Sequence, residues 1–101
     1  MAVDLSSVLG FEWDAGNSRK SVEKHDVSLA EAEQVFFNDP LLLLDDHRHS
    51  GRERRYHALG RTDIGRRLLV TFTMRGDRRL VRVISVRDMN RKEKSFYGGS
   101  A

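Results

Sequence analysis

The sequence predicts a small α+β fold in one domain, residues 11–101, with short helices packed on an antiparallel β-sheet and a short C-terminal helix. One observation is the length of 101 residues with one proline and no cysteine, which fits a single small core without disulfides. A second is a pair of alternating segments joined by a short polar turn. A third is a helical pattern that starts directly after Ser28. The lack of cysteine also excludes a zinc–thiolate centre and a cysteine nucleophile.

The N-terminal part carries the weaker signals. Residues 1–10 have no clear period and are interpreted as a loose leader. Phe11 and Trp13 alternate with acidic residues, which predicts a short extended segment with both aromatic rings on one face. A short helix is expected over residues 18–24, but it has few apolar positions and would be marginal alone.

The signal for the next helix is stronger. Ser28 and Glu31 have the spacing of a capping box, and apolar residues follow at helical intervals, which predicts a helix over residues 29–37. This helix should end before Pro40, because a residue that precedes proline disfavours the helical region. Residues 41–45 then have the pattern of a short buried strand.

Three further strands are predicted over residues 54–59, 67–75 and 80–87, with residues 76–79 as the loop between the last two. In the first strand, Tyr56 and Ala58 should oppose Arg55 and His57. A loop of two or four residues gives the same pairing of faces in the hairpin. One face then holds Val70, Phe72, Met74, Val81 and Val83, and the other holds Thr71, Thr73, Arg75 and Arg82.

Two predictions concern the end of the chain. Simple alternation places Arg87 on the apolar side of the last strand, with its guanidinium emerging at the edge. Residues 90–97 are expected to form a short helix with Phe96 as its main apolar anchor.

Charge is divided unevenly along the chain. Residues 1–47 carry three basic and ten acidic side chains, whereas residues 48–101 carry 15 basic and five acidic ones. Thirteen of those 15 are arginines, whose planar guanidinium suits phosphate contacts, although such residues also solvate ordinary surfaces. Neither a membrane span nor a secretion signal is predicted, so the expected compartment is the cytoplasm.

The motifs of metal, dinucleotide and nucleoside triphosphate sites are absent. His47 and His49, beside two aspartates, are more consistent with a solvated turn than with a metal site, so no metal or cofactor is predicted. Metal-free cleavage of RNA needs a base, an acid and cations that stabilise the phosphate. The candidate cations are Arg75, Arg82 and Arg87, and the candidate proton-transfer groups are Lys24, His25 and Tyr97. His25 as a helix cap and Tyr97 as a core aromatic are the structural alternatives.

Short motifs follow one another along residues 11–97. They are Phe11-Glu12-Trp13-Asp14, Lys24-His25, Val27-Ser28, Asp39-Pro40, His49-Ser50, Glu53-x-Arg55, Gly60, Gly65-Arg66-x-Leu68, Thr73-x-Arg75, Ile84-Ser85-x-Arg87, and Glu93 with Tyr97. In this order and with these gaps, the series resembles the BrnT family, the toxins of a bacterial type II toxin–antitoxin system. Asp26 stands where that family usually has glycine, and Asn17 where it often has lysine.

The resemblance implies a RelE-like fold, a ribonuclease activity that inhibits translation, and a BrnA-like ribbon-helix-helix antitoxin as partner. It also implies that operator DNA is contacted only through the antitoxin complex. In this hypothesis Arg75 and Arg87 hold the scissile phosphate, and Lys24 or His25 transfers a proton. Trp13 or Tyr97 stacks on a base of the RNA, and Arg82 is a weaker candidate for RNA binding.

Two other classes of function remain open. The chain could be a catalytically weak or inactive binding module that acts through its antitoxin complex in operon autoregulation, with the basic sheet face as docking surface. It could also bind nucleic acid without specificity through its arginine-rich half.

Overall fold

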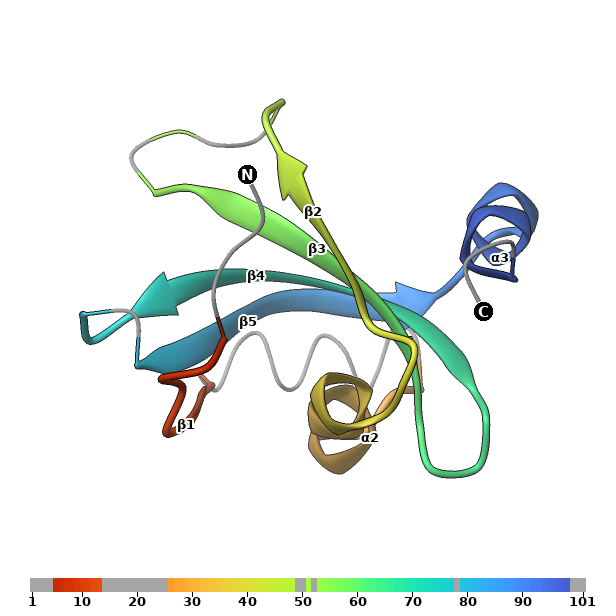
Figure 1. The fold of residues 1–101 in the computed structure, drawn as a ribbon, viewed down its shortest axis with the longest axis horizontal. Helices are drawn as coiled ribbons and strands as arrows, with labels where there is room; N and C mark the ends of the chain where they lie inside the picture. Colours follow the sequence, from red (N-terminus) through yellow and green to blue (C-terminus); the bar gives the residue numbers. More distant parts are fainter. Residues whose placement is uncertain (1–4, 14–25, 49–50, 52, 78, 99–101) are drawn as a thin grey trace.

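The computed structural model describes residues 5–13, 26–48, 51, 53–77 and 79–98, and Figure 1 shows their arrangement. A curved five-stranded sheet has the strand order β1-β5-β4-β3-β2. Strands β2 to β5 pair antiparallel with their neighbours, whereas β1 is parallel to β5, so the sheet is mixed. The predicted α+β fold is thereby confirmed. The elements are β1 (Gly10–Glu12), α2 (Leu29–Gln34), η1 (Val35–Phe37), β2 (Leu42–Asp46), β3 (Arg55–Arg61), β4 (Arg67–Arg75), β5 (Leu80–Asp88) and α3 (Arg91–Gly98).

The predicted helix over residues 29–37 is confirmed, with its last three residues in a 3-10 turn. The capping box is formed as expected. The Glu31 amide donates to the Ser28 hydroxyl at 3.1 Å, and the Ser28 amide donates to the Glu31 carboxylate at 3.0 Å. These reciprocal bonds satisfy amide groups that the first turn of a helix leaves without a carbonyl partner.

The helices α2 and η1 pack on one side of the sheet, which we call the core face. Its buried residues come from both the helical segment and the central strands. They are Val27, Ala32, Val35, Ala58, Leu68, Val70, Phe72, Val81, Val83 and Val86. The opposite side, called the open face, carries His57, Leu59, Leu69, Thr71, Thr73, Arg75, Arg82 and Arg87, as the strand register requires.

A β-bulge changes the alternation of β5. Phe72 pairs with Val83, but Thr71 pairs with Ser85, so Ile84 has no partner of its own. Arg87 consequently lies opposite Leu69 on the open face. The prediction that Arg87 lies on the apolar side is therefore wrong, because alternation cannot be counted through a bulge.

The prediction for Arg75 and Arg82 is confirmed, since both lie between the bulge and the hairpin loop and share the open face. The last pair of the hairpin joins Arg75 to Leu80, which leaves the four residues 76–79 as the loop. Gly76 and Asp77 have φ angles of 59° and 57°, in the left-handed region that such a tight turn requires.

Strand β3 continues through Gly60 to Arg61, two residues beyond the predicted end. Gly60 is buried because η1 crosses the strand closely at this point. A Cβ atom on Gly60 would lie 2.7 Å from Val35 Cγ1 and 3.1 Å from the Val35 carbonyl oxygen. The glycine is thus a site of close packing and does not end the strand.

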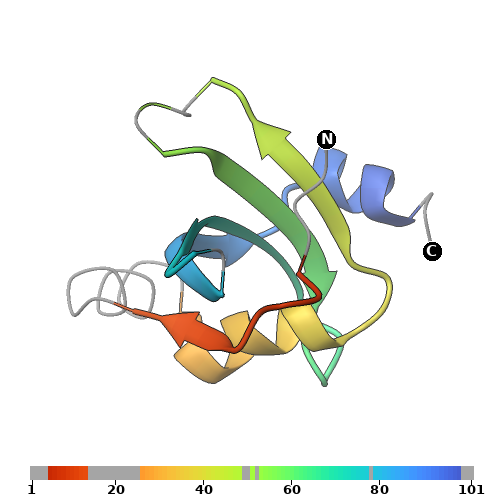
Figure 2. The ribbon, with the colours of Figure 1, turned by 60° about the vertical axis from the view of Figure 1, so that its left-hand side comes forward.

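Residues 5–9, which directly precede β1, are packed, whereas the sequence predicts a loose leader over residues 1–10. Leu5 and Val8 lie against the core face, and the Leu9 amide donates to the Arg79 carbonyl at 2.7 Å. Figure 2 shows β1 at the edge of the curved sheet, beside α2. Apolar side chains explain this packing, although their spacing has no period that a sequence search would detect. The predicted helix over residues 18–24 lies outside the described residues.

Helix α3 covers one end of the open face, as Figure 1 shows. Its anchor is Tyr97, which is 4% exposed and packs with Leu59, Leu69 and Met89. Phe96 is 54% exposed, so the prediction that it anchors the helix is wrong. The connection that follows β5 determines which face of α3 packs against the sheet. The spacing of residues within the helix does not reveal that orientation. Within the described residues, no helix is both long and apolar enough to cross a membrane.

Candidate functional site

The open face and α3 enclose a pocket of about 360 Å³. It is the place where ionisable side chains from the sheet and from the C-terminal helix meet. Its apolar lining comes from Leu44, Leu59, Leu69 and Phe96, and its ionisable lining from His57, Arg87, Lys92 and Glu93. The pocket therefore combines a possible proton-transfer group with two cations.

His57 is half-buried on β3 and held by contacts to both ring nitrogens. Its Nε2 lies 3.2 Å from a carboxylate oxygen of the buried Asp46, and its Nδ1 lies 3.0 Å from the Thr71 hydroxyl. An ionised Asp46 requires a hydrogen on Nε2, which leaves Nδ1 of the neutral ring as an acceptor. The Asp46 carboxylate thus orients His57 with its basic nitrogen toward the neighbouring hydroxyl.

Arg87 forms a bidentate ion pair with Glu93. Both guanidinium NH groups donate to the Glu93 carboxylate at 2.8 Å. This bond raises the pKa of Arg87 and lowers the pKa of Glu93, to which the Asn90 amide also donates at 2.9 Å. Arg87 remains 40% exposed, so an anionic ligand can reach it.

Arg75 and Arg82 also lie on the open face, but each is paired with a carboxylate of this chain. One guanidinium NH group of Arg75 donates to Glu53 at 3.0 Å, and Arg82 donates to Glu12 at 2.6 Å. Leu69, the strand partner of Arg87, lies six residues before Arg75, or about 20 Å along β4. The structure therefore places Arg75 and Arg87 toward opposite ends of the face, each on its own carboxylate partner.

The two aromatic candidates are held elsewhere. The Trp13 indole donates to the Glu33 carboxylate at 3.0 Å and packs against the core-face cluster. The Tyr97 hydroxyl donates to the Pro40 carbonyl at 2.6 Å, and burial raises the pKa of Tyr97. Neither ring lines the pocket.

Lys24 and His25 lie outside the described residues, as does His49. The two aspartates beside His47 are engaged by other side chains, Asp45 by Arg54 at 3.4 Å and Asp46 by His57. No group of three or more histidine, cysteine, aspartate or glutamate side chains in the described part of the chain could hold a metal ion.

Arg87 is the one pocket residue among the sequence-based site candidates, and three of the others, His57, Lys92 and Phe96, have side chains that could act on a ligand. His57 has a detectable signal, because it alternates onto the same face as Arg55 and its strand partner is Thr71. Lys92 and Phe96 are four residues apart in α3, a spacing that puts them on one helix face. This spacing identifies them as pocket residues only when the face of α3 that packs against the sheet is known.

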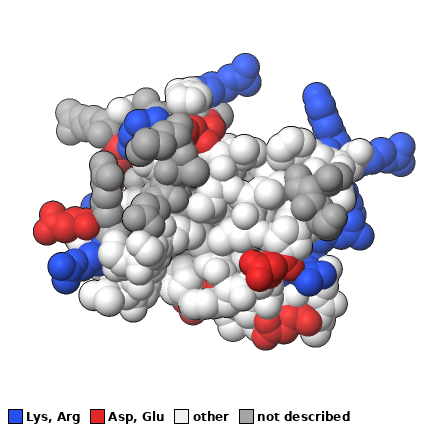
Figure 3. All heavy atoms as spheres, in the orientation of Figure 1, with Lys and Arg blue, Asp and Glu red and all other residues white. Residues whose placement is uncertain are grey.

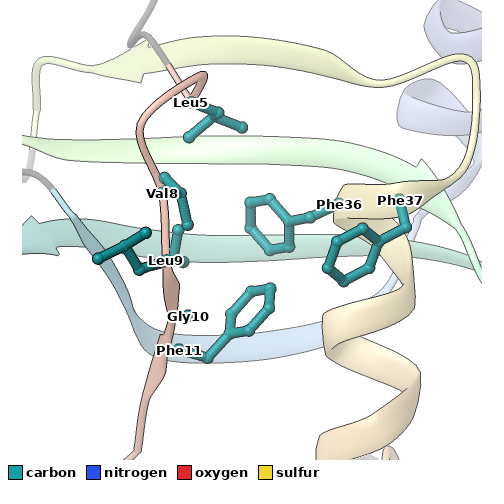
Figure 4. A pocket seen from close by; sticks show the side chains of 8 residues that line it. Leu5, Val8, Leu9, Gly10, Phe11, Phe36 and Phe37 are labelled. Atoms are coloured by element: carbon teal, nitrogen blue, oxygen red, sulfur yellow. The ribbon is translucent and has the colours of Figure 1, made fainter.

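A second pocket of about 220 Å³ lies on the core face, between the segment before β1 and the end of η1. Figure 4 shows its aromatic and aliphatic side chains gathered around the opening. None of its lining residues is ionisable: they are Leu5, Val8, Leu9, Gly10, Phe11, Phe36, Phe37 and Val81. Figure 3 shows the surface in the orientation of Figure 1, with charged side chains at the margins and an uncharged centre. This region therefore has no group for acid–base chemistry.

Comparisons with known proteins agree with this fold. The family described as the ribonuclease toxin, BrnT, of type II toxin–antitoxin systems matches residues 13–93. The crystal structure of the Brucella abortus ribonuclease toxin BrnT is similar with a TM-score of 0.62 and 19% sequence identity, over 83% of this chain and 100% of that chain. At that identity the structural similarity concerns the fold. No curated protein sequence matches the chain.

Proposed function

Because this chain belongs to the BrnT family of ribonuclease toxins of type II toxin–antitoxin systems, we propose that it cleaves RNA in the pocket between the open face and α3. The observation that carries this proposal is the presence of His57 and Arg87 in one pocket. One can transfer a proton and the other can bind a phosphate, so the pocket residues supply the main parts of a metal-free mechanism.

In the proposed reaction, the 2′-hydroxyl oxygen attacks the adjacent phosphorus and the bond to the 5′ oxygen breaks. The 2′-hydroxyl takes the place of the Thr71 hydroxyl as the hydrogen-bond partner of His57 Nδ1. His57 Nδ1 then accepts the proton of the 2′-hydroxyl. Asp46 keeps the ring oriented and stabilises the imidazolium that forms. Arg87 stabilises the additional negative charge on the phosphate oxygens, and the products are a 2′,3′-cyclic phosphate and a 5′-hydroxyl.

A second group must give a proton to the departing 5′ oxygen. Lys24 and His25 remain the sequence-based proposals for this role, and Lys92 is a cation of the described pocket. Arg75 and Arg82 lie farther along the open face, where we assign them to phosphates of neighbouring nucleotides. Membership of a toxin–antitoxin family implies an antitoxin partner. We propose that this antitoxin is a BrnA-like ribbon-helix-helix protein and that the two proteins meet in the cytoplasm. In their complex, only the antitoxin would contact operator DNA.

The test is cleavage of RNA by the purified chain in the presence of a chelator. His57→Ala should lower the rate about 10²- to 10⁴-fold, and Arg87→Ala about 10²- to 10³-fold. The matched controls are His47→Ala and Arg79→Ala, which remove the same side-chain types from exposed positions outside the pocket. Folded His57→Ala and Arg87→Ala proteins with full activity would refute this assignment of the site.

A second function is favoured by the ion pairs of the open face. Arg75, Arg82 and Arg87 are each bound to a carboxylate of this chain, which reduces the charge offered to a phosphate. In that case the open face serves mainly as a docking surface for an amphipathic antitoxin segment, because its pocket also has an apolar lining. Tight binding of the antitoxin, without RNA cleavage by the isolated chain, would favour this binding module over the enzyme.

A further inference from the structure

The eight aromatic residues of the chain all lie in its described part, and their surroundings differ. Trp13 and Tyr97 are held by hydrogen bonds to other parts of the chain. Phe37 lines the apolar pocket on the core face. Phe96 is left as the aromatic ring that lines the pocket of the proposed site. The remaining four rings pack against one another and are Phe11, Phe36, Tyr56 and Phe72.

The lining of the pocket has an apolar part and a charged part. Three leucines and the Phe96 ring form the first, whereas Arg87 and Lys92, with His57 and Glu93, form the second. A nucleotide is divided in the same way, into a base with apolar faces and an anionic phosphate. The volume of 360 Å³ is near the lower end of pockets that hold one small ligand, about 300 to 1,000 Å³. One unstacked nucleotide fits this division and size better than a paired duplex does.

The geometry of α3 links the two parts. Phe96 follows Glu93 by three residues and Lys92 by four, so the three side chains share one helix face. Glu93 in turn holds the Arg87 guanidinium at 2.8 Å. The carboxylate that holds Arg87 is therefore carried three residues, or about 4.5 Å of helix rise, from Phe96.

We propose that Phe96 stacks on the base of the nucleotide whose phosphate Arg87 holds, so that the pocket is a subsite for a single unstacked base. This inference rests on the proposed function, because it takes RNA as the ligand. Stacking recognises the flat face that every base has, so the subsite selects single-stranded over double-stranded RNA and discriminates little between bases.

The test uses a single-stranded RNA oligonucleotide with 2′-O-methyl riboses and one 2-aminopurine between two abasic positions, so that neighbouring bases do not already quench its fluorescence. Its blocked 2′ oxygens prevent cleavage, and its fluorescence is quenched when the reporter base stacks. Phe96→Leu should weaken binding about tenfold or more and remove the quenching, whereas Phe96→Trp should retain both. Phe37→Leu is the matched control, because it makes the same change at an exposed phenylalanine on the core face, and it should bind as the unaltered chain does.

Unchanged binding and quenching in Phe96→Leu would overturn the subsite, and so would an unaltered chain that does not bind the oligonucleotide. Cleavage of unmodified RNA, measured in parallel, separates this inference from the proposed function. If the unaltered chain cleaves RNA and Phe96→Leu binds the oligonucleotide as tightly as the unaltered chain does, only the subsite is refuted. Quenching that depends on Phe96, without any cleavage, supports the subsite and removes only the catalytic proposal.

Discussion

The two faces of the sheet use the same strands for different purposes. On the core face, Val70, Phe72 and Val83 are fully buried under α2, η1 and the segment before β1. On the open face, α3 covers only one end. The rest of this face carries hydrogen-bonded threonines and ion-paired arginines. Adjacent residues of one strand, such as Thr71 and Phe72, therefore belong to different environments.

This division shows how a chain of 101 residues combines an apolar core with a surface that carries ionisable and polar side chains. Apolar burial on the core face, and under α3 at one end of the open face, stabilises the fold, and the rest of the open face keeps polar groups that contribute little to stability. Substitutions on the core face should thus change the free energy of unfolding, and those of polar residues on the open face should change activity. The following three substitutions test that separation.

The largest effect on stability is expected for Phe72→Ala. The Phe72 ring is fully buried, with its centroid 5.2 Å from that of Phe36 and 5.5 Å from that of Tyr56. Loss of the ring should lower the free energy of unfolding by about 3 to 5 kcal/mol, measured by urea denaturation. Ser85→Ala, an exposed change on the open face, should alter it by less than about 0.5 kcal/mol. Similar losses in both variants would contradict the separation of the faces.

An intermediate effect is expected for Gly60→Ala, which adds one methyl group to the core face. The new Cβ would lie 2.7 Å from Val35 Cγ1, and the Val35 backbone oxygen limits how far η1 can shift. The cost should be about 1 to 3 kcal/mol in the same measurement. Gly51→Ala is the matched control, because a Cβ there meets no atom within 4 Å. Equal stability of the two variants would show that η1 does not pack as closely as described.

The smallest effect is expected from the Arg87–Glu93 pair on the open face. Arg87 lowers the pKa of Glu93 in the folded chain, so the pair stabilises the fold above the pKa that Glu93 has when unfolded. That contribution is lost as the pH falls below the ordinary pKa of glutamate, about 4.3, and through the lower pKa of the folded chain. It should be below about 1 kcal/mol, because Arg87 is partly exposed to solvent.

Urea denaturation at several pH values measures this contribution. Glu93→Gln cannot ionise at this position, so its stability should depend less on pH over the same interval. A Glu93→Gln profile parallel to that of the unaltered chain would show that the pair adds nothing to stability.

Much of the fold could be predicted because its signals are local. Strand β4 has the predicted bounds, since nine residues alternate without interruption. The helix over residues 29–37 begins at its capping box and ends before Pro40. Both elements depend on neighbouring residues in the sequence and need no knowledge of the tertiary structure.

The candidate site could be predicted only in part, because it depends on contacts between distant segments. Arg87 was expected from its residue type, but its face is set by the bulge at Ile84, which strand periodicity does not reveal. His57 becomes a candidate only when Asp46 and Thr71 are placed beside it. Lys92 and Phe96 needed the orientation of α3, which Tyr97 fixes by packing under the helix.

The position of Glu93 couples the site to the start of the C-terminal helix. Its carboxylate binds Arg87 and also accepts from the Asn90 amide, while the Glu93 amide donates to the Asn90 side chain. A phosphate that takes Arg87 competes with Glu93 for the guanidinium and brings a second negative charge toward the same carboxylate. Occupancy of the pocket is thereby linked to the integrity of a helix cap, and by thermodynamic reciprocity whatever loosens that cap alters the affinity for the phosphate.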